Sequence, residues 1–562
     1  MNISNLLKGL RNSTIDLEKF YSRIFEKIEN SPEEIWITKL SKEQIQGYIK
    51  NIEGKVDLPL YGIPFTIKDN IDLAELPTTA ACPKYAYMPK KNAFVVDLLI
   101  KAGAIPLGKT NMDQFATGLV GVRSPFGIVP NKYAQGYISG GSSSGSAVSL
   151  AYDLCAFSLG TDTAGSGRVP ACFNKLIGYK PSRGLLSNEG LVPACKSLDC
   201  ISVFANSADD AKLVFDVVAC FNEKDAYSAK LIDTVKLEAK FTFGVPSKKD
   251  LEFFGNKAYE NAFYNAVANL EAMGGLKQEV DFSPFLESAK LLYEGSWVHE
   301  RYAGLGQFIE QNLDGVEDVI KEIIIPKSTK KASDVFNDMY ALQAYKAKAD
   351  AIFAELDFIV SPTAGTCYKT EEVLKDPIKL NSNLGYYTNY MNLLDFCAIA
   401  IPSECEDNFP FGFTVVGKKF ADKNLFEIAK RYEEFSQYKE ICVCGAHLKG
   451  FPLHWQLEEL GAKFVKATKS KKCYKMYAIE NDTKPAMIRQ SEGGESFYVE
   501  IYKLSPASFA EFVGNIPAPL GIGKVFLEDG SQVSGFIGES IATEGTKDIS
   551  NFGDWRAFKN SL

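Results

Sequence analysis

The order of apolar and polar positions along the chain changes several times and predicts different elements in each part. Between Leu58 and about residue 210, short apolar runs such as 93–96 and 155–159 alternate with glycine-rich loops, a pattern typical of alternating buried strands and helices. Long periodic stretches in 255–355, Ser333–Leu356 among them, predict helices. Phe358–Thr363 is typical of another buried strand that ends in a turn. We therefore expect a large α/β domain.

The two ends of the chain have a different texture. Residues 1–50 are predicted to be helical, and Ser31-Pro-Glu-Glu34 offers an N-cap, a proline in the first turn and a capping-box glutamate. Near residue 440, period-2 alternation and tight turns begin to dominate, and Lys524–Ser534 predicts a strand, an Asp-Gly turn and a second strand. We expect a first domain over 1–439 and a small α+β domain, mostly antiparallel, over 440–562.

Composition narrows the class of protein. The chain has 562 residues, 46% of them hydrophobic and 23% charged, so it is long enough for at least two globular domains. A net charge of −8 disfavours a nucleic-acid partner. The twelve cysteines form no CxxC motif, and no window reaches membrane-spanning length without charges. These features favour buried, reduced thiols in a cytoplasmic protein without a membrane partner.

Histidine is nearly absent, which limits the possible hydrolytic chemistry. The chain contains only His299, His447 and His454, and no HExxH or paired-histidine spacing. Zinc hydrolases and ordinary serine triads both depend on histidine. We therefore expect no metal, and any serine nucleophile needs another base.

Two loops dense in glycine and serine flank an apolar run, and a lysine lies far upstream. The loops are Ser139–Ala147 and Gly160–Pro170, and the lysine is Lys68 in a segment of apolar neighbours. A desolvated lysine loses part of its preference for the charged form and can take a proton from a serine, while glycine lets backbone N–H groups approach an oxyanion. The residues alone leave alternatives open: a surface lysine paired with Asp69, and a phosphate-binding or merely flexible loop.

Taken together, these segments resemble the amidase signature family. In that family the lysine of Gly-Ile-Pro-x-x-x-Lys-Asp, a serine of Gly-Gly-Ser-Ser and the serine of Gly-Thr-Asp-x-x-Gly-Ser form a Ser–Ser–Lys triad. The resemblance implies Lys68 as the base, Ser142 as the bridging serine and Ser166 as the nucleophile. Ser144-Gly145 stands where the family usually has two glycines.

The same resemblance implies a fold and further features of the site. The amidase signature fold has a mixed central sheet flanked by helices. The family also has a cis peptide bond at the bridging serine and an oxyanion hole of backbone N–H groups. On this chain those groups belong to Thr163, Ala164, Gly165 and Ser166.

Three longer blocks, 70–83, 108–121 and 191–200, resemble the allophanate hydrolases, and the likeness extends from about residue 55 to the C-terminus. It implies cleavage of allophanate (urea-1-carboxylate) to ammonia and N-carboxycarbamate in urea degradation, without a cofactor. A functional association with urea carboxylase and a homodimer are expected. The alternative enzyme is the glutaminase-type component of a tRNA amidotransferase, which lacks this C-terminal domain.

Allophanate is small and anionic, so its pocket needs a fixed cation. Tyr293 and Arg301 are eight positions apart, hence roughly on one side of a helix, and a guanidinium can bind a carboxylate through two hydrogen bonds. By itself this pattern is typical of a salt-bridged surface arginine. The segment resembles the substrate-reading helix of the family, which implies that Tyr293, Arg301 and Gly121 contact substrate.

The C-terminal domain carries the remaining candidates. Val443–Leu448 resembles the entry loop of γ-glutamyl-cyclotransferase-like domains. In allophanate hydrolases this domain is thought to decarboxylate N-carboxycarbamate, which implies a role for His447, with His454 nearby. The alternative, from a different class, is a non-catalytic docking module that joins subunits or a neighbouring enzyme.

Overall fold

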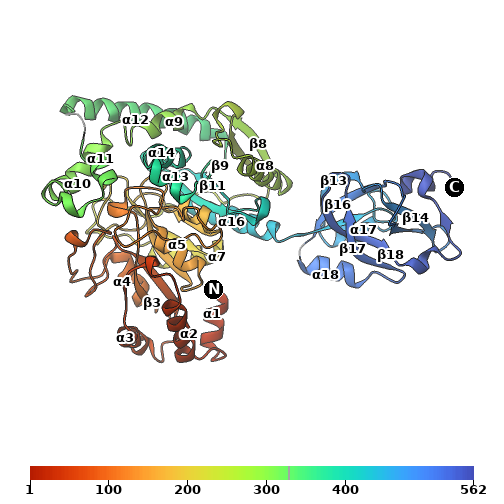
Figure 1. Cartoon of the computed structure of the whole chain (residues 1–562), viewed down its shortest axis with the longest axis horizontal. Helices are drawn as coiled ribbons and strands as arrows, with labels where there is room; N and C mark the ends of the chain where they lie inside the picture. Colours follow the sequence, from red (N-terminus) through yellow and green to blue (C-terminus); the bar gives the residue numbers. More distant parts are fainter. Residues whose placement is uncertain (327–329, 505) are drawn as a thin grey trace. The chain divides into compact units, whose positions relative to one another are not determined.

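The computed structural model describes residues 1–326, 330–504 and 506–562. It divides into two compact units, Met1–Arg431 and Tyr432–Leu562 (Figure 1). In the described part of the chain, no helix is both long and apolar enough to cross a membrane.

The first unit is built on one large sheet. Its strands are β1 (Trp36–Lys39), β2 (Pro64–Lys68), β3 (Ile105–Thr110), β4 (Phe157–Asp162), β5 (Ile177–Lys180), β6 (Cys200–Ala205), β7 (Phe241–Pro246), β8 (Gly275–Val280), β9 (Phe358–Pro362), β10 (Cys397–Pro402) and β11 (Gly412–Gly417). They lie in the order β1-β3-β2-β4-β6-β5-β10-β11-β9-β7-β8. β3, β2 and β4 run parallel, β4 to β9 pair antiparallel, and β9, β7 and β8 run parallel again. The expected mixed sheet is confirmed.

Helices cover this sheet. They are α1 (Ile3–Arg11), α2 (Leu17–Glu29), α3 (Lys42–Ile52), α4 (Phe94–Lys101), α5 (Ser144–Ala151), α6 (Val169–Phe173), α7 (Ala208–Val218), α8 (Lys257–Ala272), α9 (Ser283–Lys290), α10 (Trp297–Gln311), α11 (Asp318–Ile324), α12 (Ala332–Ile352), α13 (Thr370–Lys375), α14 (Lys379–Leu384), α15 (Tyr390–Leu393) and α16 (Asp422–Ser436). β2, β4, β6 and β11 are buried along their whole length. A strand covered on both faces carries no polar alternation, which explains the continuous apolar runs.

The apolar patterns located several elements correctly. The run at 155–159 leads into β4, the run at 93–96 begins α4, and Phe358–Thr363 contains β9. The helix-rich middle is also confirmed, because α8 to α12 lie within it, with β8 inserted between α8 and α9.

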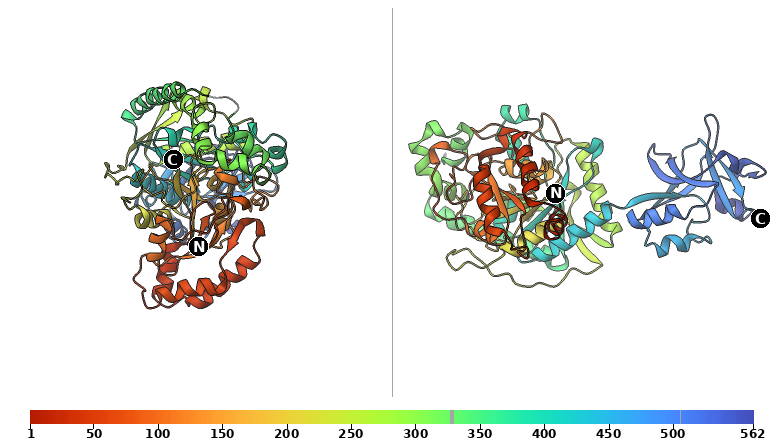
Figure 2. Two further views of the ribbon diagram at one scale, coloured as in Figure 1. Left: turned by 90° about the vertical axis from the view of Figure 1, so that its left-hand side faces the viewer. Right: turned by 90° about the horizontal axis from the view of Figure 1, so that it is seen from below.

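The prediction of a helix starting at Ser31 is wrong. Only a short 3₁₀ turn forms at Glu33–Ile35, and β1 follows it at once. The Ser31 hydroxyl donates to the Ile28 carbonyl and accepts from Trp36 Nε1 at 3.2 Å, so it does not cap a helix. β1 pairs antiparallel with β3, and α1 to α3 gather near this edge of the first unit (Figures 1 and 2).

The second unit contains two smaller sheets. Its elements are β12 (Lys439–Val443), α17 (His454–Glu459), β13 (Lys463–Lys469), β14 (Tyr474–Ile479), β15 (Lys484–Arg489), β16 (Tyr498–Leu504), α18 (Pro506–Gly514), β17 (Leu520–Phe526), β18 (Gln532–Gly538), β19 (Lys547–Asp548) and α19 (Trp555–Lys559). The sheets have the orders β13-β16-β12-β18-β17 and β15-β14-β19, and in the described part of this unit only the β12–β18 pair is parallel. The mostly antiparallel α+β architecture and the β17–β18 hairpin are confirmed.

Candidate active site

The candidate residues of the first unit gather where three parallel strands end. Lys68 is the last residue of β2; β3 ends beside it at Thr110, and β4 ends at Asp162. The carboxyl ends of neighbouring parallel strands meet at one edge of a sheet, where loops build the sites of α/β proteins. The serine loop follows β3 and the Ser166 turn follows β4. The topology therefore brings these segments together.

Lys68 is completely buried and contacts hydroxyl groups rather than a carboxylate. Its Nζ lies 2.8 Å from Ser142 Oγ and 2.7 Å from Thr161 Oγ1. The alternative of a surface lysine paired with Asp69 is wrong, because Asp69 forms its ion pair with Lys109 at 3.3 Å. An amine between two hydroxyls can exchange protons with them once it is neutral.

Burial lowers the pKa of Lys68 to about 7, although Asp113, Asp199 and Asp162 favour the charged form. Desolvation penalises the ammonium more strongly than these carboxylates stabilise it. A substantial fraction of the amine is therefore neutral near pH 7, as a general base requires.

Ser142 lies in a tight loop that precedes α5. The peptide bond between Gly141 and Ser142 is cis, as the family resemblance implies. Ser144 begins α5, where a side chain is tolerated, whereas a Cβ on Gly145 would lie 2.4 Å from the Ile35 carbonyl oxygen. Ser144 therefore replaces the one of the family's two glycines whose position can carry a side chain, and Gly145 keeps the other.

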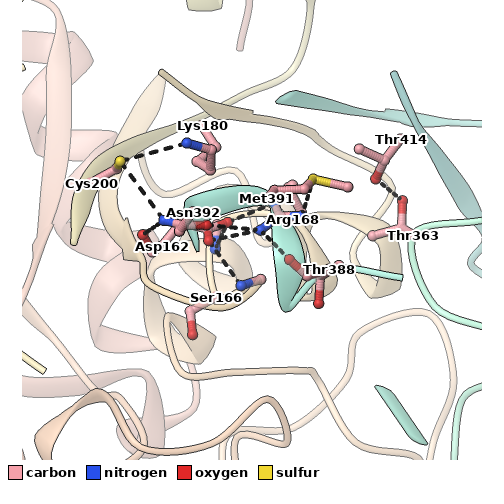
Figure 3. Close-up of polar contacts among 12 residues, drawn as sticks. Asp162, Ser166, Arg168, Lys180, Cys200, Thr363, Thr388, Met391, Asn392 and Thr414 are labelled. Atoms are coloured by element: carbon pink, nitrogen blue, oxygen red, sulfur yellow. Dashed lines mark hydrogen bonds and ion pairs between the residues drawn. The ribbon is translucent and has the colours of Figure 1, made fainter. Parts of the chain in front are cut away.

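Ser166 lies on a turn that a buried ion pair holds in shape. The Asp162 carboxylate accepts hydrogen bonds from the backbone N–H groups of Gly165 (2.8 Å) and Gly167 (3.0 Å), and it binds Arg168 Nε at 2.8 Å. Figure 3 shows this cluster, with the Ser166 side chain directed away from the ion pair. The Ser166 hydroxyl donates to the Gly118 carbonyl at 3.4 Å. The Ser166 hydroxyl therefore lies on the side of the turn opposite the Asp162–Arg168 ion pair.

One of the four predicted oxyanion donors is engaged elsewhere. The Gly165 N–H donates to Asp162, so its assignment as an oxyanion donor is corrected. Over the described ranges, the N–H groups of Thr163, Ala164 and Ser166 have no hydrogen-bond acceptor. Three unpaired donors on one turn after β4 are consistent with an anion site.

The structure joins two of the three triad candidates directly. Lys68 and Ser142 share a hydrogen bond. Among the described residues, no hydrogen bond links Ser142 to Ser166, whose hydroxyl is turned to Gly118. Proton transfer from Ser166 to Ser142 is therefore the one step of the proposed relay that lacks a hydrogen bond in the described residues.

Arg301 is buried, with a fractional exposure of 1%. Its Nη1 reaches Thr117 Oγ1 at 3.4 Å, its guanidinium lies 5.3 Å from the Tyr293 ring centroid, and its Nε has no partner. In the residues that the structure describes, no carboxylate lies within ion-pair distance of Arg301, so the salt-bridged surface arginine is wrong. A buried, unpaired guanidinium is costly and is suited to a bound anion.

The helix argument for Tyr293 is also wrong. Arg301 lies on α10, but Tyr293 lies in the turn between α9 and α10, so the chain's return, and not helical periodicity, brings them together. Tyr293 also lines a cavity of about 290 Å³ together with Arg123 and Asn381.

Gly121 contacts the serine loop. Its φ is +74°, and a Cβ there would lie 2.6 Å from the Gly140 carbonyl oxygen. Its N–H donates to Asp113 at 3.0 Å. These contacts indicate close packing of two loops at this position.

Three polar residues near the site were missed from the sequence. Thr161 contacts Lys68, Asp199 accepts a hydrogen bond from the Thr163 hydroxyl, and Asp113 holds the segment around Gly121. Burial raises the pKa of Asp199 to about 6. All three lie within the blocks quoted above, but only the folded chain brings them together.

The two histidines of the second unit face different surroundings. His447 Nε2 lies 2.8 Å from Gln456 Oε1, and its ring stacks on Phe536 at 5.1 Å in a cavity of about 370 Å³. Burial lowers the pKa of His447. His454 instead bonds the His447 carbonyl through Nδ1 at 3.0 Å and lines a separate cavity with Arg556.

Comparison with known proteins identifies relatives of both units. A family model described as Amidase matches residues 21–426, and one described as Allophanate hydrolase C-terminal domain matches residues 439–560. Urea amidolyase of Saccharomyces cerevisiae is 39% identical over an aligned length of 573 residues. The alignment covers 94% of this chain and 31% of that protein. The chain thus spans less than one third of that relative's length.

Two further comparisons bear on the choice between substrates. The solved structure of Kluyveromyces lactis allophanate hydrolase shares 37% identity and a TM-score of 0.74, covering 100% of this chain and 99% of that one. A glutamyl-tRNA(Gln) amidotransferase component of Methanosarcina mazei is 30% identical, but the match covers only 74% of this chain and 96% of that protein. The chain belongs to the amidase family, and its second unit is an allophanate hydrolase C-terminal domain.

Proposed function

We propose that the protein hydrolyses allophanate through a Ser–Ser–Lys relay. Neutral Lys68 takes the proton of Ser142, which takes that of Ser166. Ser166 Oγ attacks the terminal ureido carbonyl, and the tetrahedral species expels ammonia with a proton returned through the relay. Water then cleaves the acyl-enzyme and releases N-carboxycarbamate.

The observation that carries this proposal is the environment of Lys68. A completely buried amine lies 2.8 Å from Ser142 Oγ. Its lowered pKa makes it a base near neutral pH without imidazole. The relay further requires Ser166 Oγ to turn from Gly118 toward Ser142 when substrate binds, a rearrangement common for catalytic hydrogen bonds in unliganded sites.

The anionic substrate is supported by Arg301. Its guanidinium is buried, stacked near Tyr293 and not ion-paired. A carboxylate bound there would replace the solvation that burial removed. The Kluyveromyces relative is named allophanate hydrolase, which agrees with this substrate class.

The decisive experiment measures ammonia release from allophanate beside biuret, urea and glutamine. Allophanate is expected to be the preferred substrate. Ser166→Ala and Lys68→Ala are each expected to abolish turnover, because members of one relay are not additive. Substantial activity in either variant would refute the assignment.

The second candidate function is that of the glutaminase-type component of a tRNA amidotransferase. It is favoured by the 30% identity to the Methanosarcina protein. That likeness leaves a quarter of the chain unmatched, whereas residues 439–560 match the allophanate hydrolase C-terminal domain. Preferential release of ammonia from glutamine in the same assay would establish this alternative.

For the second unit we propose decarboxylation of N-carboxycarbamate at the cavity that contains His447. The cavity combines this histidine with Phe512 and Phe536. Cleavage of the C–N bond releases neutral carbon dioxide and moves the negative charge of one carboxylate to the nitrogen, which then takes a proton. Partly apolar surroundings solvate that carboxylate poorly and so favour its loss. The alternative is a non-catalytic docking module.

The supply of substrate and the assembly are also proposals. We propose a functional association with urea carboxylase, because the matched region occupies 31% of yeast urea amidolyase and leaves room there for a second reaction. A homodimer can be tested by sedimentation. Free and mostly buried cysteines support a reducing compartment such as the cytoplasm.

A further inference from the structure

The carboxylate of Asp113 organises the loop that contains Gly121, and no candidate assignment includes Asp113 itself. Asp113 is completely buried and follows β3. Its carboxylate accepts hydrogen bonds from the backbone N–H groups of Val120 (3.2 Å), Gly121 (3.0 Å) and Arg123 (2.9 Å). Three charge-assisted bonds from one short segment fix the shape of that segment.

The segment held by Asp113 contacts two parts of the candidate site. Its Gly118 carbonyl accepts the Ser166 hydroxyl at 3.4 Å. Oγ1 of Thr117, the residue before Gly118, lies 3.4 Å from Arg301 Nη1. The orientation of the nucleophile and that of the substrate-binding arginine therefore both depend on this segment.

Asp113 also contacts the serine loop Ser139–Ala147. Its N–H donates to the Ser142 carbonyl at 3.0 Å. A Cβ on Gly141 would lie 2.1 Å from Asp113 Oδ2, so the glycine backbone packs against the carboxylate. Asp113 thus links two parts of the site: its side chain holds the segment that faces Ser166, and its backbone N–H holds Ser142, the residue that contacts Lys68.

The charge of Asp113 favours the charged form of the Lys68 amine. Three carboxylates face the Lys68 amine: Asp113, Asp199 and Asp162. Asp162 is neutralised by Arg168. Asp113 is the largest of the three influences, and across the described ranges it has no cation within ion-pair distance. The buried Arg123 guanidinium also interacts with this carboxylate and offsets part of its field at the amine.

We propose that Asp113 is a positioning residue that holds the 117–123 segment in register with the Ser142 loop and whose negative charge acts on Lys68. This inference rests on the proposed roles of Lys68 and Ser166, but it does not depend on which amide is the substrate. It assigns Asp113 no contact with the reacting atoms.

The test uses the full chain and a fluorophosphonate probe, which labels an activated serine whatever the natural substrate. The rate of Ser166 labelling is measured against pH for the wild type and for Asp113→Asn. The asparagine is expected to lower the plateau rate about 10- to 100-fold, because an amide cannot accept all three N–H bonds. Removing the anion also favours the neutral Lys68 amine. The ascending limb of the curve of labelling rate against pH should therefore move to lower pH by about one unit.

Asp422→Asn is the matched control. Asp422 is another completely buried carboxylate of the first unit, and it accepts hydrogen bonds from Tyr179 and from the Ser182 N–H and hydroxyl. Its loss should lower stability without moving the limb. An Asp113→Asn protein with an unmoved limb or an unchanged plateau overturns the proposal.

Two further arms keep the result interpretable. If Asp113→Asn does not fold, Asp113→Glu keeps the charge and displaces the loop; a lower plateau with the wild-type limb supports the proposal, and a wild-type plateau overturns it. Failure of the wild type to consume allophanate refutes only the substrate. Labelling that persists in Ser166→Ala refutes the nucleophile and, with it, this proposal.

Discussion

At the scale of single residues, burial decides what each charged side chain can do. Lys68 and Arg301 are both buried, and neither has a carboxylate partner within ion-pair distance among the described residues. The amine can shed its charge and become a base, whereas a guanidinium keeps its charge and must find an anion. The same physical cause therefore supports two different proposed roles.

The first residue-scale prediction concerns pH. The rate constant kcat/KM for allophanate should rise with pH through about 7, because the base is active only when the Lys68 amine is neutral and its pKa is lowered to about 7. A pH–rate profile checks this. A rate that falls as the pH rises from 6 to 8 would contradict the assignment of Lys68 as the base.

The second residue-scale prediction separates carboxylate binding from general positioning. Arg301→Lys should raise KM for allophanate about 10- to 100-fold, since lysine cannot make two parallel hydrogen bonds to a carboxylate. Hydrolysis of an uncharged amide such as biuret should be nearly spared. Steady-state kinetics on both substrates provide the measurement, and equal losses on both would argue against a carboxylate-binding role.

At the scale of elements, the turn between β4 and α6 combines a rigid support with unpaired backbone donors among the described residues. The Asp162–Arg168 pair occupies the interior of the turn, and Arg168 is anchored further by the Thr388 carbonyl (Figure 3). Ser166 is left on the opposite side. A nucleophile on such a turn needs no rearrangement of its own backbone during reaction.

The element-scale prediction tests that support. Arg168→Leu leaves the buried Asp162 charge unpaired and should destabilise the first unit by about 3–5 kcal/mol. Lys212→Ala is the control, because it removes an exposed ion pair with Asp216 and should cost less than about 1 kcal/mol. Thermal unfolding of the two variants makes the comparison, and equal shifts in Tm would show that the buried pair contributes little.

The sequence predicted those elements whose apolar pattern is regular. β4 and β9 follow from continuous burial, whereas α12 was predicted from its residue pattern although, among its described residues, only Ala349 is buried. β1 could not be predicted, because it is only four residues long and exists through its pairing with β3. Its partner lies about 70 residues away, and short strands carry little periodicity of their own.

The same limit applies to the site. Lys68, Ser142 and Ser166 lie in recognisable motifs, and their chemistry can be proposed from residue type. Asp113 could not be singled out, because its three backbone partners belong to a loop whose path no local pattern specifies. Tyr293 was placed on a helix by spacing alone, although the chain turns there.

At the scale of the whole molecule, each unit holds its own candidate site and core. The serine and lysine residues all belong to the first unit, whereas His447 and its cavity of about 370 Å³ belong to the second. The proposed chemistry divides in the same way. Cleavage of the amide needs a nucleophile and a base, while decarboxylation needs partly apolar surroundings and a proton for the nitrogen from which carbon dioxide departs.

The whole-molecule prediction separates the two reactions in the full chain. His447→Ala should leave the initial release of ammonia from allophanate unchanged, because Ser166 and Lys68 are untouched. Release of carbon dioxide should lag behind ammonia, since N-carboxycarbamate then decomposes only at its uncatalysed rate. Parallel time courses of both products provide the measurement.

The variant His454→Ala serves for comparison. The His454 ring lines another cavity, so the lag of carbon dioxide in this variant should be shorter. Identical carbon dioxide curves for His447→Ala and wild type would favour the docking module, because a decarboxylation site cannot lose its histidine without effect.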